Sequence, residues 1–346
     1  MQKQVQLLDC TLRDGGQGLE DLNKNGINTD GFMEKDRTEI AQHLANAKID
    51  IIELGCMDET SKDTLKYAIY QNIQDLSKNK PKKQEENQMF VGLYRGPDTD
   101  IDSIPRRSPE TVDGVRVILR YSELQKSLDY CSKLAEKGYE VFVQPMLTMR
   151  YSDDELIKVI NAANDMNAYA VYFVDSYGYM DEFDVQRLFK IYNEKLKTKI
   201  RIGFHAHNNM QMANSNVRTF INCASANRKI IVDSCAIGMG QGAGNMQTEL
   251  AVPYLNMKYG KSYDLNQVLE VCELLDKFRI GEMNTWGYSP VRAISAIHKV
   301  AYKYAVSMRI KKDMKLPEIN YVLERMPQNL KYRYTDENLE KILLLQ

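Results

Sequence analysis

The most distinctive polar residues are two histidines, His205 and His207, in the segment GFHAHNN. They alternate along a strand-like run, so their side chains point to the same face, about 6.5 Å apart. Two imidazoles placed in this way can bind one metal ion, although a pair of core histidines with buried hydrogen-bond partners is the alternative. A divalent ion would also need an anionic oxygen ligand, because neutral imidazoles leave its charge uncompensated.

A second polar group, Asp9, Arg13 and Asp14, lies in LLDCTLRDGGQ near the N-terminus. Asp14 can supply the anionic oxygen. Arg13 is a permanent cation with a fixed fork of donors, which suits a developing oxyanion. When this segment is considered alone, the alternative is that Arg13 and Asp14 form an ion pair on a surface turn, which is common and weakly stabilising. The fold therefore determines whether the two groups meet.

The order of apolar runs predicts a TIM barrel, because eight strand-like runs alternate with amphipathic helical segments. The expected strands are residues 5–11, 49–55, 89–94, 114–120, 139–146, 170–176, 200–207 and 230–238. The expected helices include residues 36–48, 122–138, 152–167 and 180–197. In a closed barrel the first strand lies beside the eighth and near the seventh, so Asp14 can join His205 and His207. A doubly wound open sheet is the alternative.

The pattern changes near residue 280, beyond which the segments are helical. We therefore predict a barrel domain at residues 1–280 and a helical C-terminal extension at residues 281–346. Within the barrel, residues 18–32 (GLEDLNKNGINTDGF) are expected to form a long loop over the site.

Charge and hydropathy exclude several classes of partner. The formal net charge is -1, so no basic surface for nucleic acid is indicated, and no run of about 18 apolar residues could span a membrane. The six cysteines contain no CxxC pair, which argues against a disulfide framework and a cysteine zinc site. We expect a cytoplasmic protein with reduced thiols.

Five motifs in this order resemble those of the DRE-TIM metallolyases: LLDCTLRDGG, IIELG, VDSYG, GFHAHNN and GMGQGAGNMQTE. This superfamily includes 4-hydroxy-2-oxovalerate aldolase, hydroxymethylglutaryl-CoA lyase and the isopropylmalate and homocitrate synthases. The GAGN and WGYSP segments resemble the 4-hydroxy-2-oxovalerate aldolase branch most closely. For GMGQGAGN, a glycine-rich turn that binds phosphate or no ligand is the alternative, but no P-loop lysine follows.

The resemblance implies a metal site. Asp14, His205 and His207 correspond to its ligands, and Asn245 corresponds to an asparagine on or near the metal. The ion is expected to be Mn²⁺ or Mg²⁺, with Zn²⁺ or Co²⁺ as alternatives.

The resemblance also implies a substrate site beside the metal. Arg13 would stabilise an enolate, and Glu53 would orient the site near Arg13. Asp175 and Ser176 are the other candidate substrate-binding residues. Ser176 matches a serine that contacts the carboxylate of pyruvate, although a generic polar residue at a strand end is the alternative.

The general base is the point at which the sequence departs from the aldolase pattern. Gln17 stands where those aldolases have a histidine, and RDGxQ is the form found in the lyase and the acyl-CoA synthases. Tyr288 could supply a hydroxyl over the barrel mouth, or it could be a core aromatic. A metal-bound water is another candidate. His43 and His298 are expected to be structural.

The implied activity is that of a class II aldolase, a carbon–carbon lyase. Pyruvate or another 2-oxo acid would form a metal-stabilised enolate that adds to an aldehyde, or a 4-hydroxy-2-oxo acid would be cleaved in reverse. A Claisen-type acyltransferase using acetyl-CoA and a catalytically silent scaffold are the alternatives. The resemblance further suggests an aldehyde dehydrogenase partner that binds the C-terminal helices, and a homodimer.

Overall fold

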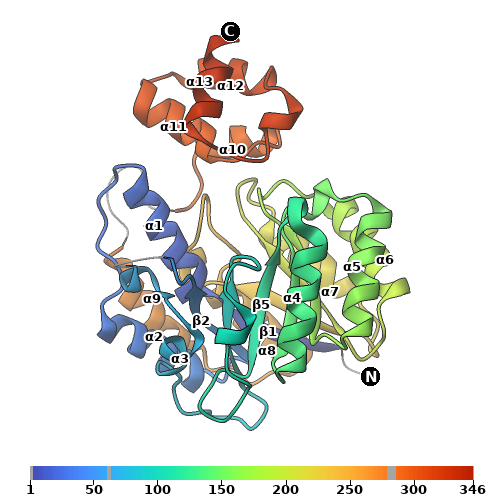
Figure 1. Cartoon of the computed structure of the whole chain (residues 1–346). Helices are drawn as coiled ribbons and strands as arrows, with labels where there is room; N and C mark the ends of the chain where they lie inside the picture. Colours follow the sequence, from blue (N-terminus) through green and yellow to red (C-terminus); the bar gives the residue numbers. More distant parts are fainter. Residues whose placement is uncertain (1–2, 61–63, 279–285, 346) are drawn as a thin grey trace.

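Eight parallel strands form a closed barrel surrounded by helices in the computed structural model, which describes residues 3–60, 64–278 and 286–345 (Figure 1). The barrel strands are β1 (Gln4–Asp9), β2 (Ile51–Met57), β4 (Met89–Tyr94), β5 (Gly114–Leu119), β6 (Glu140–Pro145), β7 (Ala170–Asp175), β8 (Arg201–Ala206) and β9 (Lys229–Ser234). Strand β1 pairs with both β9 and β2, which closes the ring and excludes an open sheet. The TIM-barrel prediction is confirmed.

One further strand was not predicted. The two-residue strand β3 (Ile69–Tyr70) pairs with the end of β2 and extends the sheet outside the ring. A pair of residues is too short to produce a recognisable alternation of apolar and polar side chains.

Helices follow the strands and cover the outside of the barrel. They are α1 (Gly16–Lys24), α2 (Glu34–Asn46), α3 (Ile73–Ser77), α4 (Leu124–Glu136), α5 (Asp153–Asp165), α6 (Glu182–Lys195), α7 (Ala213–Cys223), α8 (Thr248–Tyr259) and α9 (Leu265–Asp276). Capping residues determine where several of these helices begin. For example, Ser152 caps α5 by accepting from the backbone N–H of Glu155, whose carboxylate accepts from Ser152 in return.

The prediction of a long loop at residues 18–32 is wrong for residues 18–24, which are helical. A π-helical turn, η1 (Thr11–Gly15), runs directly into α1, and only residues 25–33 lie between α1 and α2. Glycine at the start of α1 allows close packing against a neighbouring backbone segment. A Cβ on Gly16 would lie 1.9 Å from the carbonyl oxygen of Tyr67, so the helix can approach this backbone only with glycine there.

The core has two layers. Apolar residues on the outer faces of the strands pack against the helices. The barrel interior holds a second cluster that includes Leu8, Ile51, Phe142, Tyr172 and Ile231. Charged residues occupy the interior above that cluster, toward the carboxyl ends of the strands.

Four C-terminal helices form a cap over one end of the barrel (Figure 1). The helical cap consists of α10 (Pro290–Ile297), α11 (Lys303–Lys312), α12 (Leu316–Glu324) and α13 (Asp336–Leu344), and it encloses an apolar core of its own. It contacts α1 through Asp21, whose carboxylate accepts from Tyr302 Oη and Lys303 Nζ, each at 2.9 Å. The boundary expected near residue 280 lies outside the described residues. Within the described ranges, no helix has the length and apolar character needed to cross a membrane.

Candidate active site

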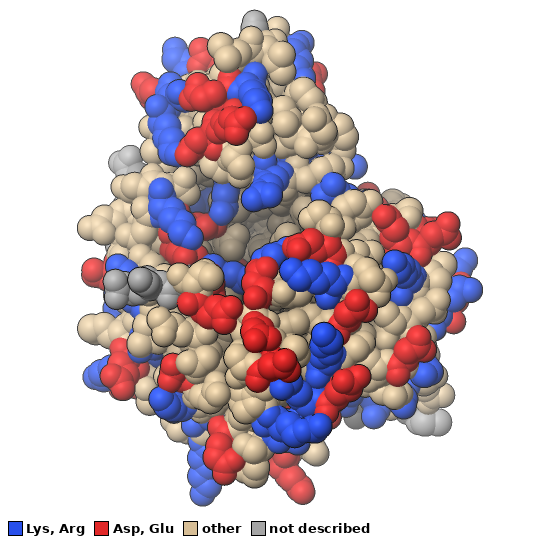
Figure 2. Space-filling view, viewed as in Figure 1, with Lys and Arg blue, Asp and Glu red and all other residues tan. Residues whose placement is uncertain are grey.

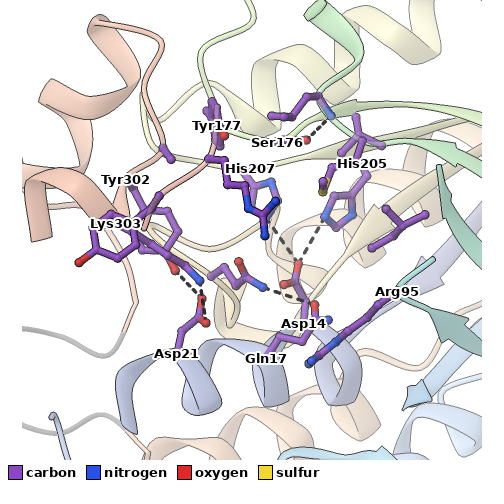
Figure 3. A pocket seen from close by; sticks show the side chains of 18 of the residues that line it. Asp14, Gln17, Asp21, Arg95, Ser176, Tyr177, His205, His207, Tyr302 and Lys303 are labelled. Carbon is purple, nitrogen blue, oxygen red and sulfur yellow. Dashed lines mark hydrogen bonds and ion pairs between the residues drawn. The ribbon is translucent and has the colours of Figure 1, made fainter. Parts of the chain in front are cut away.

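The carboxyl ends of the barrel strands bring Asp14, His205 and His207 together (Figure 3). Asp14 lies in η1, directly after β1, whereas His205 lies on β8 and His207 just beyond it. Asp14 Oδ2 is 3.3 Å from His205 Nε2 and 3.7 Å from His207 Nε2. The three ligand atoms lie within 4.8 Å of one another, so one ion can contact all of them.

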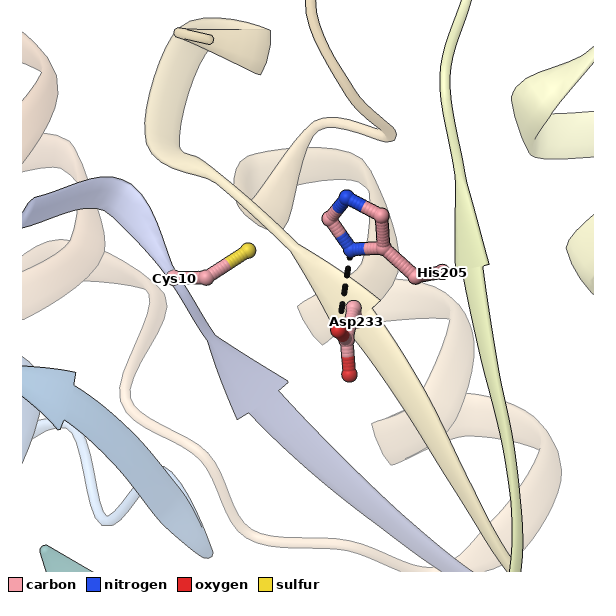
Figure 4. A group of neighbouring side chains, drawn as sticks. All are labelled: Cys10, His205 and Asp233. Atoms are coloured by element: carbon pink, nitrogen blue, oxygen red, sulfur yellow. Dashed lines mark hydrogen bonds and ion pairs between the residues drawn. The ribbon is translucent and has the colours of Figure 1, made fainter. Parts of the chain in front are cut away.

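Hydrogen bonds on the far side of each ring orient the two imidazoles. His205 Nδ1 is 2.9 Å from Asp233 Oδ2 (Figure 4), and His207 Nδ1 is 3.0 Å from the carbonyl oxygen of Asp175. A carboxylate and a carbonyl only accept hydrogen bonds, so each Nδ1 donates. In the neutral rings Nε2 is then the free ligand atom, and it faces Asp14 in both cases.

Burial and neighbouring charge prepare these groups to bind a cation. Burial opposes ionisation of Asp14, but the adjacent Arg13 and the bond to His205 hold the pKa of Asp14 well below its usual range. Burial and His205 together lower the pKa of His207 to about 4. Burial also disfavours the charged form of His205, but Asp14 and Asp233 raise its pKa well above the usual value. An ionised Asp14 and a neutral His207 are the protonation states in which these two groups can bind a cation.

Asn245 completes one side of the group. Its Nδ2 donates to Asp14 Oδ2 at 2.8 Å, whereas its Oδ1 is buried and has no hydrogen-bond partner within the described residues. The glycine-rich turn makes room for this side chain, because a Cβ on Gly240 would lie 2.3 Å from Asn245 Nδ2. A carboxylate, two imidazoles and an unpaired amide oxygen form a donor set that fits a divalent ion.

Arg13 is held by a buried network of charges. Its Nε donates to Glu53 Oε2 at 2.9 Å, and its Nη1 is 3.4 Å from Asp14 Oδ1. Arg116 Nη1 donates to the same Glu53 oxygen at 2.6 Å, and its Nη2 forms an ion pair with Asp233. Burial disfavours the charge on Arg13, but Asp14 and Glu53 raise its pKa well above the usual value. The network thus links Arg13 to Asp14 directly, and to His205 through Glu53, Arg116 and Asp233.

Arg116 and Asp233 were not predicted as site residues. Each lies in an apolar strand, in GVRVIL and KIIVDS, and points into the barrel interior. A charged residue within such a run is the signal that could have identified them, because a buried charge requires a partner.

Residues 4–277 match the HMGL-like family. The chain belongs to this family. It is 27% identical over 326 residues to 4-hydroxy-2-oxovalerate aldolase from Carboxydothermus hydrogenoformans, a match that covers 89% of this chain and 90% of that protein. The enzyme of that name from Geobacillus genomosp. 3 is 27% identical, with 78% of this chain and 76% of that protein covered. These matches confirm the family resemblance.

Solved structures share the fold. The N-terminal domain of a provisionally assigned aldolase from Bacteroides vulgatus superposes with a TM-score of 0.70 at 23% identity, covering 87% of this chain and 95% of that chain. The carboxyl transferase domain of Rhizobium etli pyruvate carboxylase, as the Y628A variant with pyruvate, gives a TM-score of 0.69 at 16% identity, with 99% of this chain and 61% of that chain covered.

Asp14, His205 and His207 lie at the floor of a cavity of about 480 Å³ between the barrel and the helical cap. Gln17 and Ser176 also line this cavity. Gln17 Oε1 accepts from Arg13 Nη1 at 3.2 Å, and Ser176 Oγ accepts from the backbone N–H of Leu147 at 2.8 Å. Both residues are therefore placed to contact a small molecule above the metal ligands.

Two expected site residues, Asp175 and Tyr288, do not line this cavity. Asp175 is buried and its carboxylate accepts from the backbone N–H groups of Tyr179 and Met180, so it shapes the turn after β7 rather than contacting a substrate. Tyr288 is 56% exposed and lines a different pocket, beside Trp286. Trp286 turns inward in its place and donates to the carbonyl oxygen of Ile237, which leaves Tyr288 in solvent.

Side chains that sequence patterns missed line the upper part of the cavity. They come from the strand ends and the cap, and they include Arg95, Arg120, Tyr177, Tyr302, Lys303 and Arg333. The remaining histidines do not line the cavity. His43 bonds Gln267, and His298 bonds Asn320, consistent with structural roles.

Proposed function

We propose that this protein is a divalent-metal-dependent aldolase that forms or cleaves a 4-hydroxy-2-oxo acid, with pyruvate or another 2-oxo acid as one product of cleavage and an aldehyde as the other. The observation that carries this proposal is the group of Asp14, His205 and His207 beside Arg13 on the floor of a cavity. Curated relatives along most of the chain are named as 4-hydroxy-2-oxovalerate aldolases, which supports the same reaction class. The enzyme is thus a carbon–carbon lyase.

Asp14, His205 and His207 would hold the ion, and Asn245, whose buried Oδ1 is unpaired within the described residues, is a candidate additional ligand. A divalent ion at this position would act as a Lewis acid on the 2-oxo group and so acidify the protons on the neighbouring carbon. Mn²⁺ or Mg²⁺ suits a donor set with carboxylate and amide oxygens, and Zn²⁺ or Co²⁺ suits its imidazoles.

Arg13 would bind the substrate and stabilise the enolate oxygen. Its guanidinium remains charged and keeps a fixed direction, because Glu53 and Gln17 accept from two of its nitrogens. Preorganised donors of this kind stabilise a charge that develops during the reaction without having to reorient. Glu53 is therefore a positioning residue, consistent with its lying behind Arg13 and away from the cavity lining.

Ser176 would bind the substrate carboxylate. Its oxygen already accepts from the backbone of Leu147, and within the described residues its hydroxyl hydrogen has no acceptor. The aldol proton must pass to a group other than Gln17, because a carboxamide has no basic atom at neutral pH.

Hydrogen exchange of pyruvate tests the enolisation step without the aldehyde. Proton NMR in D₂O should show loss of the methyl signal when Mg²⁺ is added. Arg13→Ala should slow this exchange about a hundredfold or more, as expected for removal of an oxyanion donor. Arg325→Gln is the matched control, because Arg325 lies on the cap surface and pairs with Glu324 outside the cavity. Metal-independent exchange, or none with any 2-oxo acid, would overturn the proposal.

Gln17 favours a second candidate, an acyltransferase that condenses acetyl-CoA with a 2-oxo acid. That activity would release free CoA thiol, which a thiol-specific dye detects, whereas the aldolase reaction releases none. Binding of an aldehyde dehydrogenase to the helical cap and formation of a homodimer remain predictions. Analytical ultracentrifugation of the protein alone and with the dehydrogenase tests both.

A further inference from the structure

The walls of the cavity above the metal ligands are rich in basic side chains. Figure 2 shows a hollow between the helical cap and the barrel, with basic side chains on both sides of it. Those that line the cavity come from α1, from the ends of β4 and β5, and from the cap: Lys24, Arg95, Arg120, Lys303 and Arg333. The floor adds Arg13, whereas the carboxylates lining the same cavity are Asp14, Glu20 and Asp21. Positive charge therefore exceeds negative charge around the space that a substrate would occupy.

Most of these cations have a protein partner. Arg95 pairs with Glu20 and Asp58, and Lys303 pairs with Asp21. Arg120 and Lys24 are also in ion pairs. These carboxylates keep the basic groups in place along the cavity wall, and part of each side chain remains accessible, 25% for Arg95 and 33% for Lys303.

Arg333 differs from the others. It lies between α12 and α13 of the cap, it is exposed, and within the described residues no carboxylate or carbonyl accepts from its guanidinium. Tyr332 and Tyr334 flank it in the sequence and also line the cavity. An arginine with donors available at the wall of a cavity can bind an anion there through its planar guanidinium.

We propose that the aldehyde half of the substrate carries an anionic group, a phosphate or a carboxylate, which binds between Arg333 and Lys303 of the cap and Arg95 and Arg120 of the barrel. This inference rests on the proposed function. The carboxylate of the 2-oxo acid is bound at the floor, near Arg13 and Ser176, so the basic groups at the mouth remain for the other half of the molecule. A planar guanidinium binds either oxyanion through two parallel hydrogen bonds.

Paired aldehydes test the charge preference. With pyruvate and Mg²⁺, D-glyceraldehyde 3-phosphate is compared with D-glyceraldehyde, and succinic semialdehyde with butyraldehyde. A charged member should have a kcat/KM roughly 10- to 100-fold above its neutral counterpart, the range expected for a hydrogen bond to a charged group. The two pairs distinguish phosphate from carboxylate. Equal values in both pairs would overturn the inference.

Arg333→Gln locates the effect. This variant should lower kcat/KM for the preferred charged aldehyde about tenfold or more and so reduce its advantage over the neutral aldehyde. Arg325→Gln, which removes a cap arginine outside the cavity, should leave the advantage unchanged. An advantage that survives Arg333→Gln would refute the assignment of this site.

Calorimetric titration with glycerol 3-phosphate separates this inference from the proposed function. Binding that weakens in Arg333→Gln, in a protein that does not exchange pyruvate, would overturn the aldolase and retain the anion site. Pyruvate exchange without any such binding to wild type, and without a preference for either charged aldehyde, would retain the aldolase and overturn the anion site.

Discussion

The buried carboxylate behind His205 provides a sharp test of how the metal site is built. Asp233 accepts from His205 Nδ1 at 2.9 Å and from Tyr172 Oη at 3.0 Å, and it pairs with Arg116, whose side chain is fully buried. Asp233→Asn keeps the shape and removes the charge. We expect weaker metal binding and a less stable fold, because the same carboxylate orients a ligand and neutralises a buried arginine.

The two effects have separate magnitudes. Removing one partner of a buried ion pair costs about 3 to 5 kcal/mol, and Arg116 keeps Glu53, so a loss near 3 kcal/mol is expected in chelator. Loss of a partner behind a metal-binding histidine lowers metal affinity about 10- to 100-fold. At saturating metal, this loss of affinity lowers the free energy of unfolding by roughly a further 1.4 to 2.7 kcal/mol, because bound metal stabilises the folded state less.

Urea unfolding followed by fluorescence of Trp286, the single tryptophan, measures stability with chelator and with metal. Isothermal titration calorimetry measures metal affinity directly. Asp113→Asn is the matched control. Asp113 lies just before β5, at the opposite end of the barrel, and pairs with Lys83 and Arg107. Unchanged metal affinity in Asp233→Asn would refute the reasoning that Asp233 prepares His205 to bind the ion.

Three further outcomes follow from the same geometry. His207→Ala should abolish both metal binding, measured by inductively coupled plasma mass spectrometry, and pyruvate exchange. Its circular dichroism spectrum should change little. Loss of activity at full metal occupancy would contradict this prediction. Chelation of the metal should lower the thermal unfolding temperature and metal addition should restore it, because the ligands converge only in the folded chain; an unchanged temperature would argue against the site. Gly203→Ala should lower the free energy of unfolding, measured by urea denaturation, by about 1 to 3 kcal/mol, because the new Cβ would lie 2.3 Å from the Tyr172 ring. An unchanged free energy of unfolding would show that the ring moves aside at little cost.

Strand positions were predictable because each barrel strand is a short, mostly buried apolar run, and every consecutive pair except β4 and β5 is separated by an α-helix. The eight expected runs overlap the eight barrel strands. The loop expected at residues 18–32 is helical as far as Lys24. This helix lies close to a backbone segment that is distant in the sequence: a Cβ on Gly18 would lie 2.8 Å from the carbonyl oxygen of Gly240, a contact that no local pattern can reveal.

The side chains of the candidate site were predictable in part. In a closed barrel, Asp14 after one strand and His205 and His207 at the end of another lie at one site, because the carboxyl ends of parallel strands lie at the same rim. The roles of Arg13, Glu53, Gln17, Ser176 and the metal ligands remain predictions that the experiments above test. Asp175 and Tyr288 were misplaced, since local turn geometry and the inward rotation of Trp286 determine where their side chains point.

By itself, the sequence determined the repeated strand–helix order, the barrel it implies, and the residues with the chemistry to bind a divalent ion. These features depend on local periodicity and on side-chain type. The tertiary structure alone decided that Arg116 and Asp233 connect Arg13 to His205, and that the cap places Lys303 and Arg333 over the cavity. The Arg116–Asp233 pair joins residues 117 positions apart, and contacts of this kind depend on packing that no periodic pattern in the sequence reveals.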